Sequence, residues 1–249
     1  MRAHRLGVLA FGVAGAVAGC SDGFGFGAPD PVTDQGADTL ELWRGVHWTA
    51  AAVGLLVWGL VLYCMLRYRR RDDALPSQSG ENIPMEVLYT VTPLVIVGVL
   101  FAFTMATQQS QIELSDDPDV VVDVVGFQWS WRFTYPEEGV VVNPDGVGAP
   151  ELVVPVGATV RFRLETADVN HSFWVPRFLV KRDLIPGIDN QIEVDVTEPG
   201  RWEGRCAEFC GLDHYRMNFS VRAVPAGEYD QWLDDQRAVQ VAPEQGASS

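Results

Sequence analysis

Two long apolar runs constrain this chain more than any other feature of its sequence. Val46 to Leu66 and Val87 to Ala106 each hold about 20 residues without an Asp, Glu, Lys or Arg. At about 1.5 Å per residue, a helix of that length crosses a hydrocarbon core of about 30 Å. Because a buried helix of a soluble protein usually keeps a polar stripe, both runs are predicted to be transmembrane helices, forming a hairpin over residues 45–110.

Basic residues indicate how this hairpin is oriented. Four arginines follow the first run between positions 67 and 71, whereas no basic residue follows the second run before Arg132. Short cytoplasmic loops are rich in Lys and Arg, so the loop from Arg67 to Pro84 is expected on the cytoplasmic side. Both termini are then expected on the extracytoplasmic side of the membrane.

The first residues have the features of an export signal. Two arginines precede an apolar stretch from Leu6 to Ala18, and Val17-Ala18-Gly19-Cys20 resembles the lipobox of bacterial lipoproteins. Removal of residues 1–19 would leave Cys20 as a lipid-modified N-terminus on the outer face of the membrane. The alternative is an ordinary secretory signal with a spare cysteine.

Two segments are expected to lack packed structure. Residues 20–44 are predicted to be an extracytoplasmic tether, because Gly, Asp and Pro are frequent from Asp22 to Asp38 and no hydrophobic period is present there. Residues 241–249 are predicted to be a disordered tail. Neither segment is assigned a function.

From about Val120 onward the hydrophobic pattern changes to a period of two. Apolar and polar side chains alternate in Thr159–Glu165 and in Gln191–Val196, as in strands with one buried and one solvated face. Further strands are predicted at Val121–Trp131, Leu152–Val156 and Asn218–Ala223. Residues 111–240 are therefore expected to form a sandwich or barrel, with a short helix from Ala226 to Arg237 docked on it.

The charge of the chain is strongly negative and unevenly placed. The formal net charge is -15, and the region from Ser110 onward holds 24 acidic and 11 basic residues, a net charge of -13. Such a surface repels nucleic acid and favours a basic partner. A surface that is acidic only for solubility is the alternative.

Metal-ligand residues are few in the region from 111 to 240, and most of them lie together. Its only histidines are His171 and His214, its only cysteines Cys206 and Cys210, and its only methionine Met217. Four of the five follow the spacing C-x3-C-x3-H-x2-M, and His171 lies 35 residues upstream of this loop. Thiolate, imidazole and thioether donors suit copper, and two nearby thiolates can bridge two metal ions.

Three other arrangements use some of the same donors. A Cys2His2 zinc site would use both cysteines and both histidines but leave Met217 without a role. A disulfide between Cys206 and Cys210 is possible outside the cell, although it would leave both histidines unused. A mononuclear blue-copper site needs one cysteine, two histidines and a methionine, so the second cysteine would be unexplained.

The loop resembles the copper-binding loop of cytochrome c oxidase subunit II, C-x-E-x-C-G-x-x-H-x-x-M. An upstream segment is similar to the same family at several positions: Asp168, His171, Ser172, Val175, Pro176, Lys181, Asp183 and Ile185-Pro186-Gly187. The likeness runs from the first apolar run to the terminal helix and leaves out only the leader, the tether and the tail.

This resemblance implies a two-helix transmembrane hairpin followed by an all-β cupredoxin-like Greek-key barrel with a short C-terminal helix. The barrel would carry the mixed-valence dinuclear copper centre called CuA. The implied ligand residues are His171, Cys206, Glu208, Cys210, His214 and Met217. The two cysteines would bridge two copper ions, and each histidine would bind one. The methionine would complete one copper and the backbone carbonyl of Glu208 the other, while the Glu208 carboxylate would face a magnesium ion shared with subunit I.

The resemblance also assigns roles to two residues outside the loop. Trp129, in the aromatic run from Gly126 to Tyr135, would receive electrons from cytochrome c, whereas most other rings of that run are expected to fill the core. Glu86 precedes the second apolar run, where the family places a carboxylate at the cytoplasmic mouth of a proton pathway into subunit I. An acid at a helix N-terminus also compensates the helix dipole, which is the simpler explanation.

The function implied by the resemblance is electron transfer within a proton-pumping oxidase of the bacterial plasma membrane. The chain lacks the haem-attachment motif C-x-x-C-H, and its membrane part holds only His47, so the oxygen-reducing haem centre is expected in a partner subunit. The expected partners are oxidase subunits I and III and a basic cytochrome c, or a c-type haem domain of a quinol-oxidising complex. The alternative is a membrane-tethered copper carrier, which two spans and a closed set of five ligand residues disfavour.

Overall fold

The computed structural model describes residues 25–71, 73, 75, 78–144 and 149–241. The leader, the predicted lipidation site Cys20 and the tail beyond residue 241 lie outside these residues. The described chain divides into two compact units. One is a helical hairpin that takes in residues 41–108, and the other, called the sandwich domain below, combines residues 28–40 with the chain from 109 onward.

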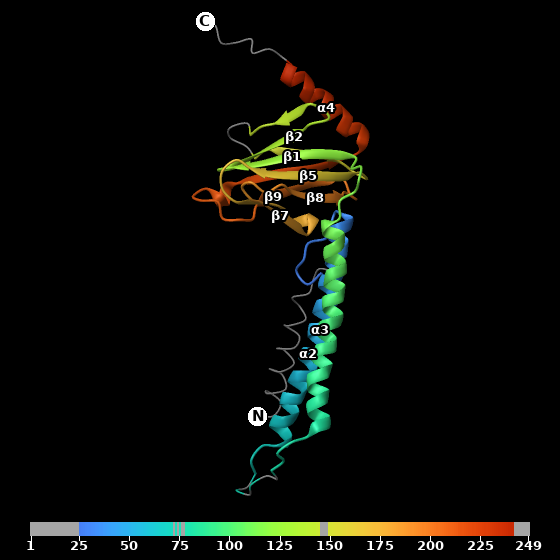
Figure 1. Cartoon of the computed structure of the whole chain (residues 1–249), viewed down its shortest axis with the longest axis vertical. Coiled ribbons are helices and arrows are strands. Elements are labelled where there is room, and N and C mark those ends of the chain that lie inside the picture. Colours follow the sequence, from blue (N-terminus) through green and yellow to red (C-terminus); the bar gives the residue numbers. More distant parts are fainter. Residues whose placement is uncertain (1–24, 72, 74, 76–77, 145–148, 242–249) are drawn as a thin grey trace, which may run out of the picture. The chain divides into compact units, whose positions relative to one another are not determined.

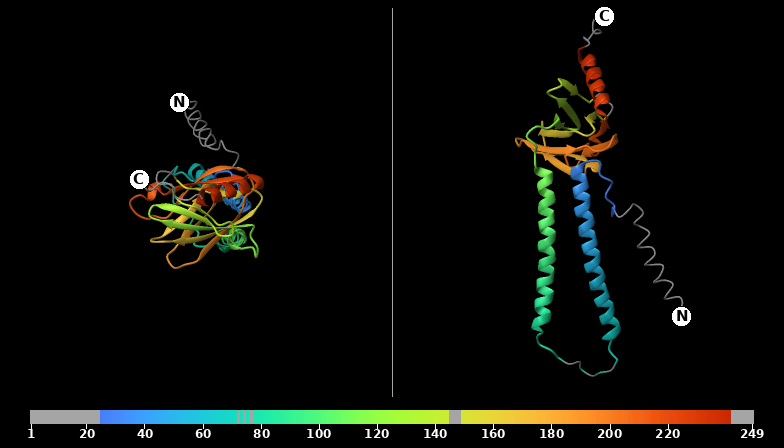
Figure 2. Two further views of the ribbon diagram at one scale, coloured as in Figure 1. Left: turned by 90° about the horizontal axis from the view of Figure 1, so that it is seen from above. Right: turned by 90° about the vertical axis from the view of Figure 1, so that its right-hand side faces the viewer.

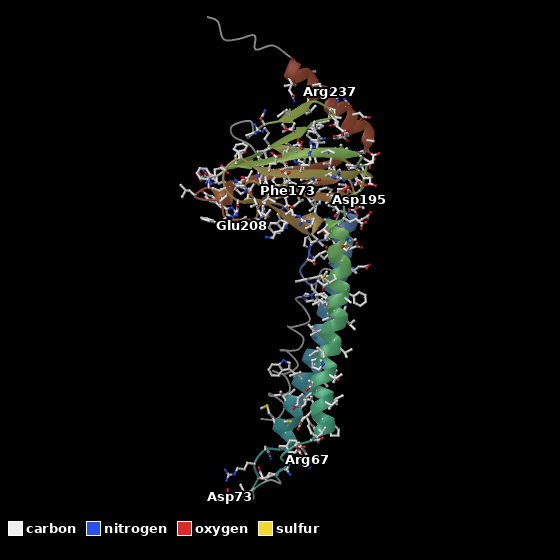
Figure 3. All side chains as sticks on the ribbon, viewed as in Figure 1. Arg67, Asp73, Phe173, Asp195, Glu208 and Arg237 are labelled. Atoms are coloured by element: carbon white, nitrogen blue, oxygen red, sulfur yellow. The ribbon has the colours of Figure 1, made fainter. Side chains whose placement is uncertain are left out.

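The hairpin consists of most of two long helices, α2 (Asp34–Arg67) and α3 (Ile83–Ile112). The two helices run antiparallel (Figure 2), and Figure 3 labels Arg67 and Asp73 where the chain turns between them. Each contains an apolar stretch long enough to cross a membrane, and none of either stretch is buried within the described structure. Such exposed apolar side chains are those of membrane-spanning helices, as the sequence predicts for both runs.

The predicted tether is shorter than expected, because α2 begins at Asp34 and not near residue 45. The Thr33 hydroxyl accepts a hydrogen bond from the Gly36 amide, which caps the helix at this early position. Just before the helix, Thr33 forms a β-bridge with Val196, and the Thr197 amide donates to the Val32 carbonyl. The chain from Val32 to Gly36 is therefore part of the sandwich domain.

The sandwich domain contains two five-stranded sheets among its described residues (Figure 1). The first sheet has the order β3-β2-β1-β5-β8, with strands β1 (Val120–Phe127), β2 (Ser130–Tyr135), β3 (Val140–Val142), β5 (Thr159–Thr166) and β8 (Asn190–Asp195). The second has the order β4-β10-β9-β6-β7, with strands β4 (Glu151–Pro155), β6 (His171–Val175), β7 (Val180–Leu184), β9 (Gly200–Cys206) and β10 (Asn218–Val224). Each sheet has one parallel pair, β1 with β5 and β4 with β10. The all-β fold class predicted from the sequence is confirmed.

Aromatic rings fill the space between the sheets. Trp131 and Phe133 project inward from β2 and are fully buried. Phe219 of β10 packs edge-on against both, and it stacks on Phe173 of β6 at a centroid distance of 4.9 Å. Because these rings pack beside the loop that follows β9, the candidate metal-ligand residues rest on a rigid surface from which water is excluded.

A terminal helix, α4 (Ala226–Val241), packs on the sandwich through Tyr229 and Leu233. It begins where the sequence predicts and runs four residues further than Arg237. The sequence prediction was wrong in one place nearby: Val121–Trp131 is not one strand, because the chain turns at Gln128 and Trp129 and returns as β2. This turn places both side chains at the end of the sheet.

Candidate metal centre

The candidate ligand residues come from two neighbouring strands, β6 and β9, and from the loop that joins β9 to β10. His171 is the first residue of β6, and Cys206 is the last residue of β9, with which β6 pairs. Beyond Cys206 the chain passes Cys210 and the short 3₁₀ helix η2 (His214–Arg216) to Met217, and then enters β10. The Cys206 amide donates to the Met217 carbonyl at 2.9 Å, which closes the loop.

Cys206 is surrounded by three other donors. Its sulfur lies 3.8 Å from Nδ1 of His171, 3.2 Å from the backbone carbonyl oxygen of Glu208 and 3.9 Å from the sulfur of Cys210. Both sulfurs are free thiols, because a disulfide bond would be about 2.05 Å long. His171 is fully buried and Cys206 nearly so.

Cys210 has a second set of neighbours. Its sulfur lies 3.5 Å from Nδ1 of His214 and 3.7 Å from the thioether sulfur of Met217. Met217 is fully buried, whereas His214 is half-buried and packs edge-on against the exposed ring of Phe209. The centre therefore has a dry interior side at Met217 and reaches the surface at His214.

The two thiols differ in acidity. Burial alone would raise the pKa of Cys206, but hydrogen bonds with His171 and with the backbone of Glu208 lower it to about 7. Burial and the neighbouring Cys206 thiolate raise the pKa of Cys210 to about 12. One thiolate is thus partly formed at neutral pH, and the second needs a bound cation to stabilise its charge.

His171 is oriented by Asp168, a residue to which the sequence analysis assigned no role of its own. Nε2 of His171 lies 2.8 Å from Oδ1 of Asp168, so this nitrogen carries the proton and Nδ1 faces the cysteines with its lone pair. The other oxygen of Asp168 accepts the Gln128 amide at 2.7 Å. Although burial opposes it, the bonds from Gln128 and His171 lower the pKa of Asp168, which keeps the carboxylate charged.

Trp129 reaches the loop directly. Its indole Nε1 donates to the Cys210 carbonyl at 3.3 Å, and the Gln128 side chain donates to the same oxygen at 2.7 Å. Gly211 has a φ of +120°, and a Cβ there would lie 3.3 Å from the indole nitrogen. The ring itself is half-buried, so one part contacts the ligand loop and another part meets solvent.

Two other predicted site residues, Glu208 and Glu86, do not add their carboxylates to this cluster. Glu208, labelled in Figure 3, has its side chain exposed on the loop, and only its backbone carbonyl faces Cys206. Glu86 lies in the first turn of α3, where its carboxylate accepts the Asn82 amide at 3.0 Å. This hydrogen bond is that of an ordinary helix cap.

Comparison with known proteins gives the chain its family. Residues 24–106 match the family described as "Cytochrome C oxidase subunit II, transmembrane domain", and residues 145–224 match "Cytochrome C oxidase subunit II, periplasmic domain". A protein of Streptomyces avermitilis called "Probable cytochrome c oxidase subunit 2" is 40% identical over 278 aligned residues, which cover 94% of this chain and 87% of that protein. The chain belongs to the cytochrome c oxidase subunit II family.

A second curated relative agrees with this assignment. "Cytochrome c oxidase subunit 2" of Mycobacterium tuberculosis is 34% identical, with 93% of this chain and 80% of that protein covered. Among solved structures, the periplasmic domain of cytochrome oxidase subunit II of Bradyrhizobium japonicum is 29% identical and covers 51% of this chain and 99% of its own, with a TM-score of 0.46. As a member of the cytochrome c oxidase subunit II family, the chain is a membrane-anchored subunit of an oxidoreductase.

Proposed function

We propose that this chain holds a dinuclear CuA centre and passes electrons from a cytochrome c to the haem centres of subunit I. The observation that carries the proposal is the pair of free sulfurs 3.9 Å apart, each with its own imidazole nitrogen within 3.8 Å. Two further donors, the Met217 sulfur and the Glu208 carbonyl, approach one cysteine each. Six donors in two groups exceed what one tetrahedral ion uses.

The spacing of these donors fits metal binding. Metal–sulfur bonds of about 2.3 Å and metal–nitrogen bonds of about 2.0–2.1 Å place the ligand atoms of a tetrahedral ion about 3.3–3.8 Å apart. The five sulfur-centred separations in the cluster span 3.2–3.9 Å. A closed Cys2His2 zinc site would leave Met217 and the Glu208 carbonyl as idle neighbours, so copper is favoured.

The chain's own residues prepare this site for electron transfer. A bound copper pair would supply a one-electron carrier. Asp168 fixes the ring of His171, and the buried aromatic rings around Met217 hold the ligands and exclude water. Because the ligands are held by a rigid sandwich, their positions need change little when the charge of the centre changes.

A direct test is metal analysis and electron paramagnetic resonance of the full-length chain, purified in detergent and loaded with copper. We expect two copper ions per chain, a purple colour and one electron shared by two nuclei. One ion per chain, or a preference for zinc when both metals are offered, would contradict the proposal. The Met217→Leu variant should keep two coppers and change the spectrum, because only one ion loses a ligand.

Trp129 is proposed as the residue through which electrons reach the centre, because its ring joins solvent to the Cys210 carbonyl. The Trp129→Leu variant should oxidise cytochrome c at least tenfold more slowly in the assembled oxidase while its copper content stays normal. Stopped-flow oxidation of reduced cytochrome c measures this rate. The matched control is Trp43→Leu, which also removes an exposed indole. Trp43 is far from the ligand loop in sequence and belongs to the helical hairpin. Normal turnover of the Trp129 variant would contradict the assignment.

The remaining expectations are part of the same proposal. Subunits I and III are the proposed membrane partners, and the domain boundaries, the outward-facing termini and lipidation of Cys20 remain predictions.

A magnesium ion at the Glu208 carboxylate and a proton pathway beginning at Glu86 rest on the family resemblance. Their tests are metal analysis after Glu208→Gln and the ratio of protons pumped to electrons transferred after Glu86→Gln. A copper carrier would instead transfer its metal to an acceptor protein without turnover.

A further inference from the structure

The turn between β1 and β2 carries two side chains that donate to the same backbone oxygen. Phe127 of β1 pairs with Ser130 of β2, so Gln128 and Trp129 are the two residues of a tight turn. Nε2 of Gln128 donates to the Cys210 carbonyl at 2.7 Å, and Nε1 of Trp129 donates to it at 3.3 Å. Because N–H···O hydrogen bonds in proteins are about 2.7–3.2 Å long, the glutamine makes the stronger of the two.

Few hydrogen bonds attach the ligand loop, residues 206–217, to the rest of the sandwich. Near its start, the Ala207 amide donates to the Ser172 carbonyl at 3.1 Å. Between residues 208 and 216, the Cys210 carbonyl is the only group among the described residues that forms a hydrogen bond outside the loop. The position of Cys210 therefore depends on the two donors of the turn, and mainly on Gln128.

The ligand loop has a glycine where this carboxamide comes close. Gly211, the residue after Cys210, has a φ of +120°, and a Cβ there would lie 3.1 Å from Nε2 of Gln128. A larger residue would crowd the carboxamide and would also be strained at that φ. The hydrogen bond from Gln128 is therefore part of a close contact between the turn and the loop, although the residue as a whole is exposed.

Gln128 also contacts the other side of the candidate metal centre, through its backbone. Its amide donates to Oδ2 of Asp168 at 2.7 Å, and Oδ1 of the same carboxylate lies 2.8 Å from Nε2 of His171. One residue thus reaches Cys210 directly and His171 through Asp168. A substitution of Gln128 removes only the bond to Cys210, because the bond to Asp168 comes from the backbone.

We propose that Gln128 is a positioning residue of the metal centre, whose carboxamide holds the Cys210 carbonyl and with it the Cys210 sulfur. That sulfur lies 3.5 Å from Nδ1 of His214 and 3.7 Å from the sulfur of Met217, so a shift of the Cys210 backbone would separate three candidate ligands. Without the carboxamide, only the longer bond from Trp129 would remain. Metal would then leave the centre faster, and electrons would enter it more slowly. This proposal rests on the metal centre of the proposed function.

The test compares two variants that remove the donor in different ways. Gln128→Leu replaces the carboxamide with an apolar group of similar size, whereas Gln128→Glu keeps its shape but, when ionised, can only accept hydrogen bonds. The full-length chain in detergent, loaded with copper, is mixed at pH 8 with an excess of a chromophoric chelator. We expect both variants to lose copper about tenfold faster than the unmodified chain. Their electron paramagnetic resonance spectra should show changed copper hyperfine splittings.

A matched control is Gln231→Leu, which removes an exposed carboxamide from α4. Its rate of copper loss and its spectrum should equal those of the unmodified chain. Copper loss as slow in both Gln128 variants as in the control would overturn the proposal. Fast loss in Gln128→Leu alone would overturn it too, because the carboxamide would then act through its shape and not through its hydrogen bond.

Steady-state oxidation of cytochrome c by the assembled oxidase separates positioning from docking of the electron donor. Positioning predicts a several-fold lower kcat with an unchanged KM in both Gln128 variants. A raised KM with unchanged kcat and unchanged copper loss would assign Gln128 to docking and overturn the proposal. The number of copper ions in the unmodified chain tests the proposed function separately. A single ion would contradict that function, whereas the ratio of the copper-loss rates would still decide the role of Gln128.

Discussion

His171 is held between a sulfur on one side and a carboxylate on the other, so both of its ring nitrogens have defined partners. Although burial opposes protonation, the bonds to Cys206 and Asp168 raise the pKa of His171. Below this raised pKa, Nδ1 also carries a proton that a metal ion must displace. Above it, the ring already presents the Nδ1 lone pair in the orientation that the metal needs.

Asp168→Asn tests this arrangement at the scale of one residue. The variant keeps the shape of the side chain but loses the charge that fixes the histidine tautomer, so copper affinity should fall about 10–100-fold. Competition with a chromophoric copper chelator measures the affinity. Asp189→Asn, another exposed acid, is the control and should leave affinity unchanged. Equal affinities of the two variants would show that Asp168 does not orient the ligand.

The thiol pKa values predict how copper loading depends on pH. Protonated thiols must release their protons to bind metal, and the pKa values of about 7 for Cys206 and about 12 for Cys210 make that release pH-dependent. Below pH 7 both thiols release protons, whereas above it Cys206 is already a thiolate and only Cys210 contributes. Proton release should thus fall toward about one per chain between pH 6 and 9, while copper affinity rises.

An anaerobic titration of the copper-free chain with cuprous ions in a weakly buffered indicator solution measures these protons. Cys210→Ser should abolish the release that persists above pH 8. Proton release that grew with pH would contradict the assigned order of the two thiols.

At the scale of elements, the sequence predicted some strands and missed others, and burial on one face does not separate the two groups. β5 alternates buried and more exposed side chains, whereas Ile192, Glu193 and Val194 of β8 are buried in succession. The predicted bounds of both strands differ from the observed ones by one residue at one end or at both. β3, β6, β7 and β9 were not predicted. β3 is only three residues long, and the first three residues of β6 are buried in succession. The loop spacing identified candidate ligand residues that the structure brings together, but the Asp168–His171 bond depends on how β6 begins, which no periodicity encodes.

The start of α2 offers a test of how one element docks on the sandwich. A Cβ at Gly36 would lie 2.8 Å from the Phe178 carbonyl oxygen and 2.8 Å from the Thr33 hydroxyl. Gly36→Ala should therefore destabilise the domain by about 1–2 kcal/mol, after allowance for the better helix propensity of alanine. Gly45→Ala is the control, since nothing lies within 4 Å of its Cβ position. Thermal unfolding followed by near-ultraviolet circular dichroism checks both, and equal midpoints would exclude tight packing at Gly36.

At the scale of the whole molecule, charge is the property that governs encounters. The net charge of -15 is concentrated in the region from Ser110 onward, so a basic cytochrome c would be attracted over about one Debye length. We expect the second-order rate of cytochrome c oxidation to fall at least tenfold between 10 and 300 mM salt. Stopped-flow kinetics of the oxidase in detergent measure the rate. A rate independent of salt would mean that the electron donor is not recruited through this surface.

The whole-molecule organisation was only partly visible in the sequence. The two spans followed from two long runs without charged residues, and the β-rich region followed from the change of hydrophobic period near Val120. The resemblance supplied the candidate metal site. The docking of residues 32–36 on β8 was not foreseen, because a Gly- and Pro-rich stretch without periodicity carries no signal of a partner that lies 160 residues away.

The bridge between Thr33 and Val196 has a practical consequence for anyone who prepares the water-soluble half of this protein. A fragment starting after α3 would leave the Thr197 amide and the Asp195 amide without the acceptors that Val32 and Gln35 provide. Strand β8 at the edge of the first sheet would then have unpaired backbone groups, through which copies of the fragment would associate. Fusing residues 28–36 back through a short Gly/Ser linker should keep such a fragment monomeric.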